Sequence, residues 1–172
     1  MAKKDKDKGG KDEKSGKELK IISVQVITPE KVLENERQIS LLYVIEKLGP
    51  MHEKTLFHIL KELKDEYNVD LGYTIRKVGN VPYSPEVKND LVALLYVGFV
   101  ETEPNMYRKL RITSKGKDAL EQKKPPAGII SAIEKHYEAL RNKASMLDSM
   151  QDAEIRRLTR TMRRPSRRPP LF

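Results

Sequence analysis

Apolar positions along the chain follow a helical period over most of its length and a strand-like alternation in only a few short segments. In residues 22–26 apolar and polar side chains alternate, which predicts a half-buried strand. Residues 28–48 predict a helix, because a capping threonine and a proline open the segment and a glycine–proline pair ends it. A second, amphipathic helix is expected in residues 52–67. The connector that follows has turn residues and room for a short strand at 73–78.

The clearest helix signal begins at Ser84, where a capping hydroxyl is followed by Pro85 and by an acid, Glu86. Gly98 supplies the left-handed residue that commonly ends such a helix. A third helix is therefore predicted over residues 85–97. Its expected buried face consists of Val87, Leu91, Leu94 and Leu95.

An antiparallel hairpin is predicted directly after this helix. A strand begins at 99–100, a turn follows at 103–105, and the return strand places alternate side chains on opposite faces. The hydroxyl residues at 113–114 can cap a further helix that ends near residue 120. The two faces of the return strand are Leu110 and Ile112 on one side and Tyr107, Lys109 and Arg111 on the other.

A long C-terminal helix is predicted over 127–160, after the break at Pro125 and Pro126. Its apolar residues recur at alternating spacings of three and four, the pattern of a coiled-coil seam, until Gln151 interrupts it. We expect this seam to pair two chains in a homodimer, although the same residues could pack on the chain's own domain. The expected dimerisation residues are Ile130, Ile133, Tyr137, Leu140, Ala144 and Leu147.

Composition and charge separate the ends of the chain from its middle. At 172 residues, with 38% apolar and 34% charged side chains, the chain can form one domain while part of it stays outside the core. Of the net charge of +9, residues 1–20 carry eight lysines against five acids, and residues 151–172 carry seven arginines against two acids. The Lys-rich segment 1–17 and the Arg/Pro-rich segment 161–172 are therefore expected to be disordered tails. The longest apolar run, 91–100, is too short for a membrane span, and the N-terminus lacks the apolar core of a secretory signal.

The order helix, helix, connector, helix, hairpin over residues 28–122 resembles the winged helix-turn-helix superfamily. The segment "KLRITSKGKDAL" is similar to the wing strand and following helix of many microbial winged-helix regulators, which share the pattern I-T-x-x-G-x-x-A-L. The segment "VPYSPEVKNDLVALLYVGFVE" resembles the Pro-Tyr-Ser helix start of YwgA-like and Panacea-type proteins, with Val81 in place of that motif's usual glycine. The C-terminal helix resembles the dimerising helix of PadR-type regulators in architecture. These resemblances imply a mainly α fold with a small β hairpin (α+β): a winged helix-turn-helix domain over 18–124, a long C-terminal helix and two basic tails.

In a helix-turn-helix protein the third helix enters the major groove and reads base edges. Here that helix, with its cap, holds two acids, one lysine and no arginine, so it is a weak set of base ligands. The hairpin is better suited to nucleic acid, since its five basic residues could neutralise phosphates. A basic hairpin edge can also be a solvated edge that blocks strand pairing. The candidate nucleic-acid ligands are Ser84, Lys88 and Asn89 on the helix and Tyr107, Arg108, Lys109, Arg111, Lys115 and Lys117 on the wing and after it.

The sequence shows no catalytic motif. Phosphate-cradling glycine motifs and cysteine are absent, and the three histidines have no metal-ligand spacing. We therefore expect a non-enzymatic cytoplasmic protein without a metal or cofactor. The first hypothesis is a dimeric DNA-binding transcriptional regulator whose Arg-rich end adds contacts to phosphate or to an acidic partner. The alternative is an interaction scaffold that docks on another protein in an antitoxin-like, transcription or ribonucleoprotein assembly.

Overall fold

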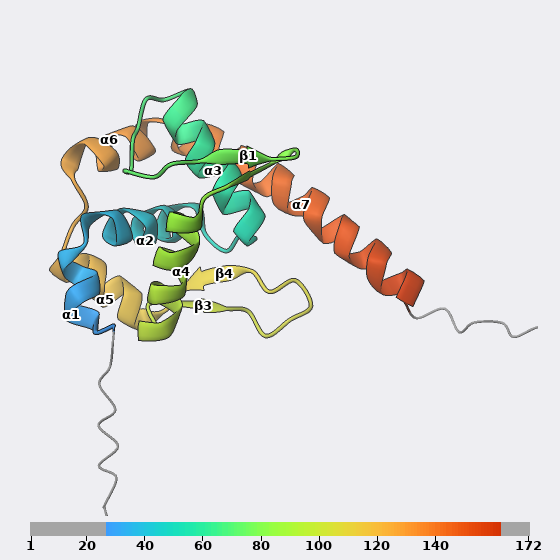
Figure 1. The fold of residues 1–172 in the computed structure, drawn as a ribbon, viewed down its shortest axis with the longest axis horizontal. Helices are drawn as coiled ribbons and strands as arrows, with labels where there is room; N and C mark the ends of the chain where they lie inside the picture. The colour runs from blue at the N-terminus through green and yellow to red at the C-terminus, as the bar shows by residue number, and fades with distance from the viewer. Residues whose placement is uncertain (1–26, 163–172) are drawn as a thin grey trace, which may run out of the picture.

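The computed structural model describes residues 27–162 as mainly helical with two small antiparallel hairpins (Figure 1), which confirms the predicted α+β class at this level. The predicted strand at 22–26, the tail at 1–17 and all but the first two residues of the tail at 161–172 lie outside the described residues. The helices are α1 (Pro29–Glu34), α2 (Glu36–Leu48), α3 (Glu53–Asp65), α4 (Pro85–Val97), α5 (Ser114–Gln122), α6 (Ala127–Lys135) and α7 (Tyr137–Met162). The strands are β1 (Arg76–Val78), β2 (Val81–Tyr83), β3 (Val100–Thr102) and β4 (Leu110–Ile112).

The helix expected over 28–48 is divided in two at Asn35, which corrects the prediction of one continuous helix. Asn35 has an extended backbone, and its side-chain Oδ1 accepts a hydrogen bond from the Arg37 N–H at 3.1 Å, which caps α2. Asparagine favours this capping position over the interior of a helix, because its short polar side chain bonds to nearby backbone groups. The expected cap at Thr28 is present at the start of α1.

Helix α2 forms the centre of the core (Figure 1). Every residue from Ile39 to Ile45 is buried, so this helix is enclosed on all sides. Helices α4, α5 and α7 and strand β4 all pack against it. Because all four elements begin at residue 85 or later, α2 connects the early part of the chain to the late part through one apolar core.

The predicted second helix is α3, which ends two residues before the expected position at residue 67. The connector after it holds a complete hairpin, β1–β2, where the sequence predicted a single short strand. Arg76 pairs with Tyr83 and Val78 with Val81 in antiparallel register. Gly79, with a φ of 63°, reverses the chain between the two strands at a backbone conformation that favours glycine.

Both predicted ends of α4 are confirmed. The Ser84 hydroxyl accepts a hydrogen bond from the Val87 N–H at 3.4 Å, and proline follows at the first helical position. Gly98 ends the helix with a left-handed φ of 78°. Hairpin β1–β2 therefore leads directly into the start of α4, and hairpin β3–β4 begins directly after its end (Figure 1).

The predicted hairpin β3–β4 is also confirmed, with Val100 opposite Ile112. Met51, in the short link between α2 and α3, forms an isolated antiparallel bridge to Leu110 of β4. The Met51 N–H donates to the Leu110 carbonyl at 3.2 Å, and the Leu110 N–H donates to the Met51 carbonyl at 2.8 Å. The hairpin is thus fixed by backbone hydrogen bonds to the segment that begins α3.

The Thr-x-x-Gly part of the wing motif has a structural explanation in α5. Of the two possible caps, Thr113 is the one used, and its hydroxyl accepts from the Gly116 N–H at 3.1 Å. A Cβ at Gly116 would collide with the backbone carbonyl of Phe99. Glycine is therefore required for α5 to pack closely on the start of the hairpin.

The C-terminal helix is divided at His136, which corrects the prediction of one helix over 127–160. His136 lies between α6 and α7 outside the helical conformation, and its ring stacks on Tyr67 with 4.1 Å between ring centroids. The second piece, α7, has 26 residues and reaches Met162. Despite this length it is polar, and within residues 27–162 no helix is long and apolar enough to cross a membrane.

The heptad pattern of this region corresponds to packing within the chain. Ile133, Leu140 and Ala144 are 1%, 0% and 5% exposed and belong to the same core as α2 and α3. The other three seam residues, Ile130, Tyr137 and Leu147, are partly buried. The assignment of this seam as a dimer interface is therefore corrected, because its central side chains already contact the chain's own domain. The alternative expectation, packing on that domain, describes the structure.

Candidate nucleic-acid interface

The start of α3 is capped by a carboxylate from a distant part of the chain. His52 occupies the N-cap position, but its side chain makes no capping hydrogen bond. Asp148 of α7 takes this role: it accepts from the His52 backbone N–H at 3.0 Å and from the Thr55 hydroxyl at 2.5 Å. A carboxylate at this place pairs an otherwise free N–H and interacts favourably with the helix dipole. The middle of α7 is thereby attached to the start of α3.

The same part of α7 holds hairpin β3–β4 through Lys109. The Lys109 ammonium lies 3.3 Å from Asp148 and 3.1 Å from Asp152, and its side chain is only 19% exposed. Asp152 also contacts Nε2 of the His52 ring at 2.6 Å. Three separate elements therefore meet in one polar cluster. We call this cluster, formed by His52, Thr55, Lys109, Asp148 and Asp152, the clasp.

The charges of the clasp shift the pKa values of two of its members. Burial would raise the pKa of Asp152, but hydrogen bonds from His52 and Lys109 outweigh it and hold the pKa below its ordinary value. Burial would lower the pKa of Lys109, but its bonds to both aspartates outweigh it and raise the pKa. Both groups are therefore charged and paired at neutral pH. This corrects the assignment of Lys109 as a free phosphate ligand, because two carboxylates already neutralise it.

The tip of hairpin β3–β4 lies against the distal part of α7. The guanidinium of Arg156 sits over the Tyr107 ring, 5.7 Å from its centroid, and the Lys109 ammonium lies 6.0 Å from the same centroid. Tyr107 is consequently half-buried between two cations, and its role as a nucleic-acid ligand stays a prediction. Arg108, the next residue, is exposed. The contact brings the positive charge of the hairpin tip close to that of α7.

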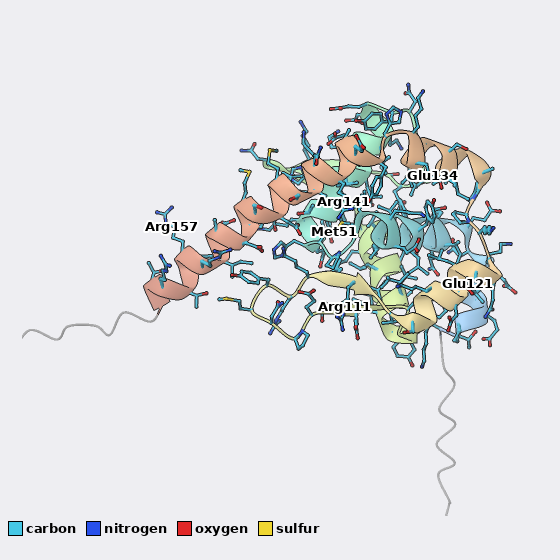
Figure 2. All side chains as sticks on the ribbon, turned by 180° about the vertical axis from the view of Figure 1, so that it is seen from behind. Met51, Arg111, Glu121, Glu134, Arg141 and Arg157 are labelled. Atoms are coloured by element: carbon cyan, nitrogen blue, oxygen red, sulfur yellow. The ribbon has the colours of Figure 1, made fainter. Side chains whose placement is uncertain are left out.

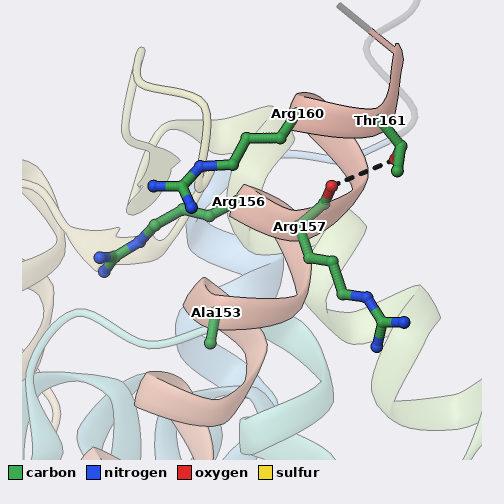
Figure 3. Close-up of a pocket in the computed structure, with 5 residues that line it drawn as sticks. All are labelled: Ala153, Arg156, Arg157, Arg160 and Thr161. Atoms are coloured by element: carbon green, nitrogen blue, oxygen red, sulfur yellow. Dashed lines mark hydrogen bonds between the residues drawn. The ribbon is translucent and has the colours of Figure 1, made fainter. Parts of the chain in front are cut away.

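Beyond this contact α7 extends away from the rest of the described chain, and Figure 2 shows Arg157 near its free end. Arg156 and Arg160 point to one side of the helix, the side on which Arg156 contacts the hairpin tip, whereas Arg157 points away from them (Figure 3). Among residues 27–162 no acidic side chain forms an ion pair with Arg108, Arg156 or Arg160. We call these three arginines the cationic edge.

The polar residues predicted to read bases from α4 differ in their availability. Ser84 is fully buried and caps the helix, so its assignment as a base reader is corrected. The Lys88 ammonium lies 2.6 Å from both carboxylate oxygens of Glu53 and is therefore paired within the protein. Asn89 is exposed, as a base reader must be.

Both acidic side chains of α4 accept hydrogen bonds from other parts of the protein, so their negative charges do not define the outer face of the helix. Asp90 is buried, where it accepts from the Tyr73 hydroxyl at 3.0 Å and from the Gln38 amide at 2.8 Å. Burial and the adjacent Asp90 charge raise the pKa of Tyr73, which keeps its hydroxyl a donor. Glu86 accepts a hydrogen bond from the Thr74 N–H at 2.9 Å. The negative balance of this helix in the sequence is therefore not a negative outer face.

The remaining predicted ligands lie toward the base of hairpin β3–β4. Arg111 pairs across the two strands with Glu101, with 2.6 Å between Nε and Oε1, so part of its charge is compensated. Lys115 and Lys117 are exposed on α5. The structure therefore divides the predicted wing ligands between the hairpin tip, where Arg108 lies, and its base.

Two features of the surface around α4 were not predicted. Arg76 and Lys77 are exposed on β1, in the hairpin that leads into the helix. On α4 itself Val92 and Tyr96 are 49% and 62% exposed, although the helix is otherwise mostly packed on the core. A basic dipeptide in a short strand is a common surface feature, so the sequence offered no specific signal for Arg76 and Lys77. Val92 and Tyr96 lie off the predicted buried face of the helix, but nothing in the sequence assigned them a role.

The clasp was also absent from the sequence predictions. Its hydrogen bonds join residues separated by 43 to 100 positions, and no local pattern connects them. The arginines of α7 were recognised as charge, but their place beside the hairpin tip follows only from the fold. No protein-family model, no curated protein and no solved structure matches this chain. Its function is therefore argued from the chemistry of these surfaces.

Proposed function

We propose that residues 28–122 form a winged helix-turn-helix domain in which α4 is the recognition helix and β3–β4 is the wing. The order α2, α3, α4, β3, β4 supports this proposal, as does the backbone bridge between Met51 and Leu110. Through that bridge Met51 pairs with β4 as a very short third strand beside the wing. Hairpin β1–β2 is then an insertion in the connection between α3 and α4.

We further propose that the protein binds double-stranded DNA and acts as a transcriptional regulator in the cytoplasm. The observation that carries this proposal is the contact of Arg156 with Tyr107, which joins the wing tip to the arginine-bearing end of α7. Guanidinium groups that have no acidic partner among residues 27–162, placed on two supporting elements, are suited to phosphate oxygens, because their planar donors match phosphate geometry. The sequence continues after Met162 with four more arginines, which adds positive charge at the same end of the helix.

DNA fits this arrangement better than double-stranded RNA. The major groove of B-form DNA admits an α-helix, whereas that of A-form RNA is too deep and narrow for side chains to read. Helix α4 has a neutral, exposed outer face with a basic hairpin leading into it and the wing following it. Phosphate contacts from the hairpins would then position the helix in the groove.

The test is an anisotropy titration of the full chain with a short duplex at about 50 and 200 mM salt, where phosphate contacts make affinity fall steeply. Arg156→Gln with Arg160→Gln should weaken binding and reduce the magnitude of the logarithmic salt slope by about 2, close to one unit per lost contact. The matched control is Lys123→Gln with Lys135→Gln, which removes the same charge from exposed sites remote from α7's free end. An equal loss in both variants would show that net charge alone is measured. Absence of duplex binding at low salt would refute the proposal.

A second candidate function, an interaction scaffold, is favoured by the exposed apolar side chains Val92 and Tyr96. Exposed apolar groups on the outer face of a helix are suited to contact with another protein. The two candidates differ in a pull-down with and without nuclease treatment. A scaffold would retain a protein partner after nuclease digestion and lose it on substitution of Val92 and Tyr96 by serine.

A further inference from the structure

The outer face of α4 consists of the exposed side chains that make no ion pair or hydrogen bond to the rest of the described chain. Lys88 is paired with Glu53, and Asp90 is buried in hydrogen bonds. The exposed side chains that remain along the helix include Asn89, Val92 and Tyr96. We call these three residues the reading face. It has one amide, one branched aliphatic group, one phenol and no charge.

The three residues lie along one side of the helix, because spacings of three and four bring side chains to the same face. Asn89 and Val92 are separated by about 4.5 Å along the helix axis at 1.5 Å per residue. Successive base pairs in DNA are about 3.4 Å apart along the duplex. Two side chains at this separation can therefore address neighbouring base pairs when the helix lies in the major groove.

The chemistry of these groups selects bases. An asparagine amide donates to N7 and accepts from the N6 amino group of adenine, and an aliphatic side chain packs on the C5 methyl group of thymine. Guanine is commonly read by arginine or lysine, and within residues 85–97 the only such side chain is Lys88, which pairs with Glu53. The reading face thus has partners for adenine and thymine and lacks a free cation for guanine.

We propose that the protein recognises adjacent A·T base pairs in the major groove, with Asn89 bound to an adenine and Val92 packed on a thymine methyl group. This inference rests on the proposed DNA-binding function and adds the class of sequence that the protein prefers. The cationic edge supplies affinity without sequence preference, and the reading face supplies the preference.

The experiment begins with selection of the tightest sites for the full chain from a randomised duplex library. Replacement of the selected A·T pairs by G·C should weaken binding about tenfold or more, the effect of losing a bidentate base contact. Single-atom changes in the DNA then test each residue. Replacement of adenine by 7-deazaadenine, which lacks N7, should weaken binding by the wild type. The affinity of the Asn89→Ala variant should be the same for both duplexes. Replacement of thymine by uracil should weaken wild-type binding about fourfold for one buried methyl group, and Val92→Ser should not respond.

The matched control is Asn142→Ala, an exposed asparagine on α7 that should keep both responses. Circular dichroism of each variant checks that helix content is unchanged, as expected for exposed positions. Binding to all duplexes with equal affinity, or selection of G·C-rich sites, would overturn the A·T inference while the DNA-binding function stands. Failure to bind any duplex would instead overturn the proposed function. Insensitivity of the wild type to both modified bases would also reject the assigned roles of Asn89 and Val92.

Discussion

In the first half of α7, residues 137–152, Leu140 and Ala144 are buried against the core and Asp148 joins the clasp. In the second half, residues 153–162, none of the side chains from 153 to 161 is buried, and three of these nine residues are arginine. One helix is therefore a structural element over its first half and a charged arm over its second. The backbone is continuous between them, so the position of the arm is determined by the packing of the first half.

This difference explains why the heptad pattern was misleading. A spacing of three and four residues shows only that one helix face is buried, and the burying partner can be another chain or the same chain. The pattern stops near Gln151, where the helix leaves the core and the clasp replaces apolar packing. The end of an apolar seam thus marks the boundary between the two halves.

The largest expected effect is the difference in the free energy of unfolding between a substitution at a buried position of α7 and one at an exposed position. Leu140→Ala removes a fully buried side chain from the core and should lower the free energy of unfolding by about 3 kcal/mol. Met150→Ala, at a position 63% exposed on the same helix, should change it by less than about 0.5 kcal/mol. Urea denaturation followed by circular dichroism measures both. Similar values for the two variants would mean that α7 is not packed as described.

Light scattering of the same two variants addresses the homodimer, which stays a prediction. If the seam joined two chains, Leu140→Ala would lower the particle mass at a protein concentration where it remains folded. We expect no such change, because the Leu140 side chain contacts the chain's own core. A dimer that persists in both variants would have to use another surface.

The boundary between the halves can be tested at Asp148. Asp148→Ala leaves the His52 N–H, the Thr55 hydroxyl and one side of Lys109 without their acceptor. A lost helix cap with a buried unsatisfied donor should cost about 2 kcal/mol. The control is Asp65→Ala, which removes an exposed i,i+4 ion pair with Lys61 and should cost under about 0.5 kcal/mol. Equal small effects would show that the clasp does not hold α7 to α3.

Much of the fold was predictable where local chemistry decides it. The ends of α4 follow from a capping serine and a left-handed glycine, and hairpin β3–β4 follows from alternation around a turn. The breaks at Asn35 and His136 were missed. Asn35 carried a usable signal, since asparagine is a strong cap, whereas the stacking of His136 on Tyr67 depends on the tertiary fold.

For the candidate site, the sequence predicted which basic residues are present but not which of them are paired with acids. The sequence identified basic residues on the wing, but it could not show that Lys109 and Arg111 have acidic partners while Arg108 has none in the described chain. Charge pairing depends on side chains brought together by the fold, in the case of Lys109 from 43 residues away. A count of lysines and arginines therefore overestimates the charge that is available to a ligand.

The smallest expected effect concerns pH and the partly buried Asp152. Its pKa is lowered in the folded chain from the ordinary value of 3.8, so its pairing stabilises the fold above that value and is lost as the pH falls through the lower, folded pKa. The groups that face it are the His52 ring of the α3 cap and Lys109, which directly precedes β4, with Asp148 one turn before it on α7. Asp152→Asn should lower the free energy of unfolding by about 1 kcal/mol at pH 5 to 6, since one partly exposed ion pair is removed. The gap between wild type and variant should begin to narrow below about pH 4, where the unfolded wild-type chain takes up a proton, and should close only below the lower, folded pKa, where Asp152 is uncharged in both states. Urea denaturation at pH 6, 4 and 3 measures this gap. A gap that stays constant over that range would show that the Asp152 charge does not stabilise the clasp, and that hydrogen bonding by either side chain is sufficient.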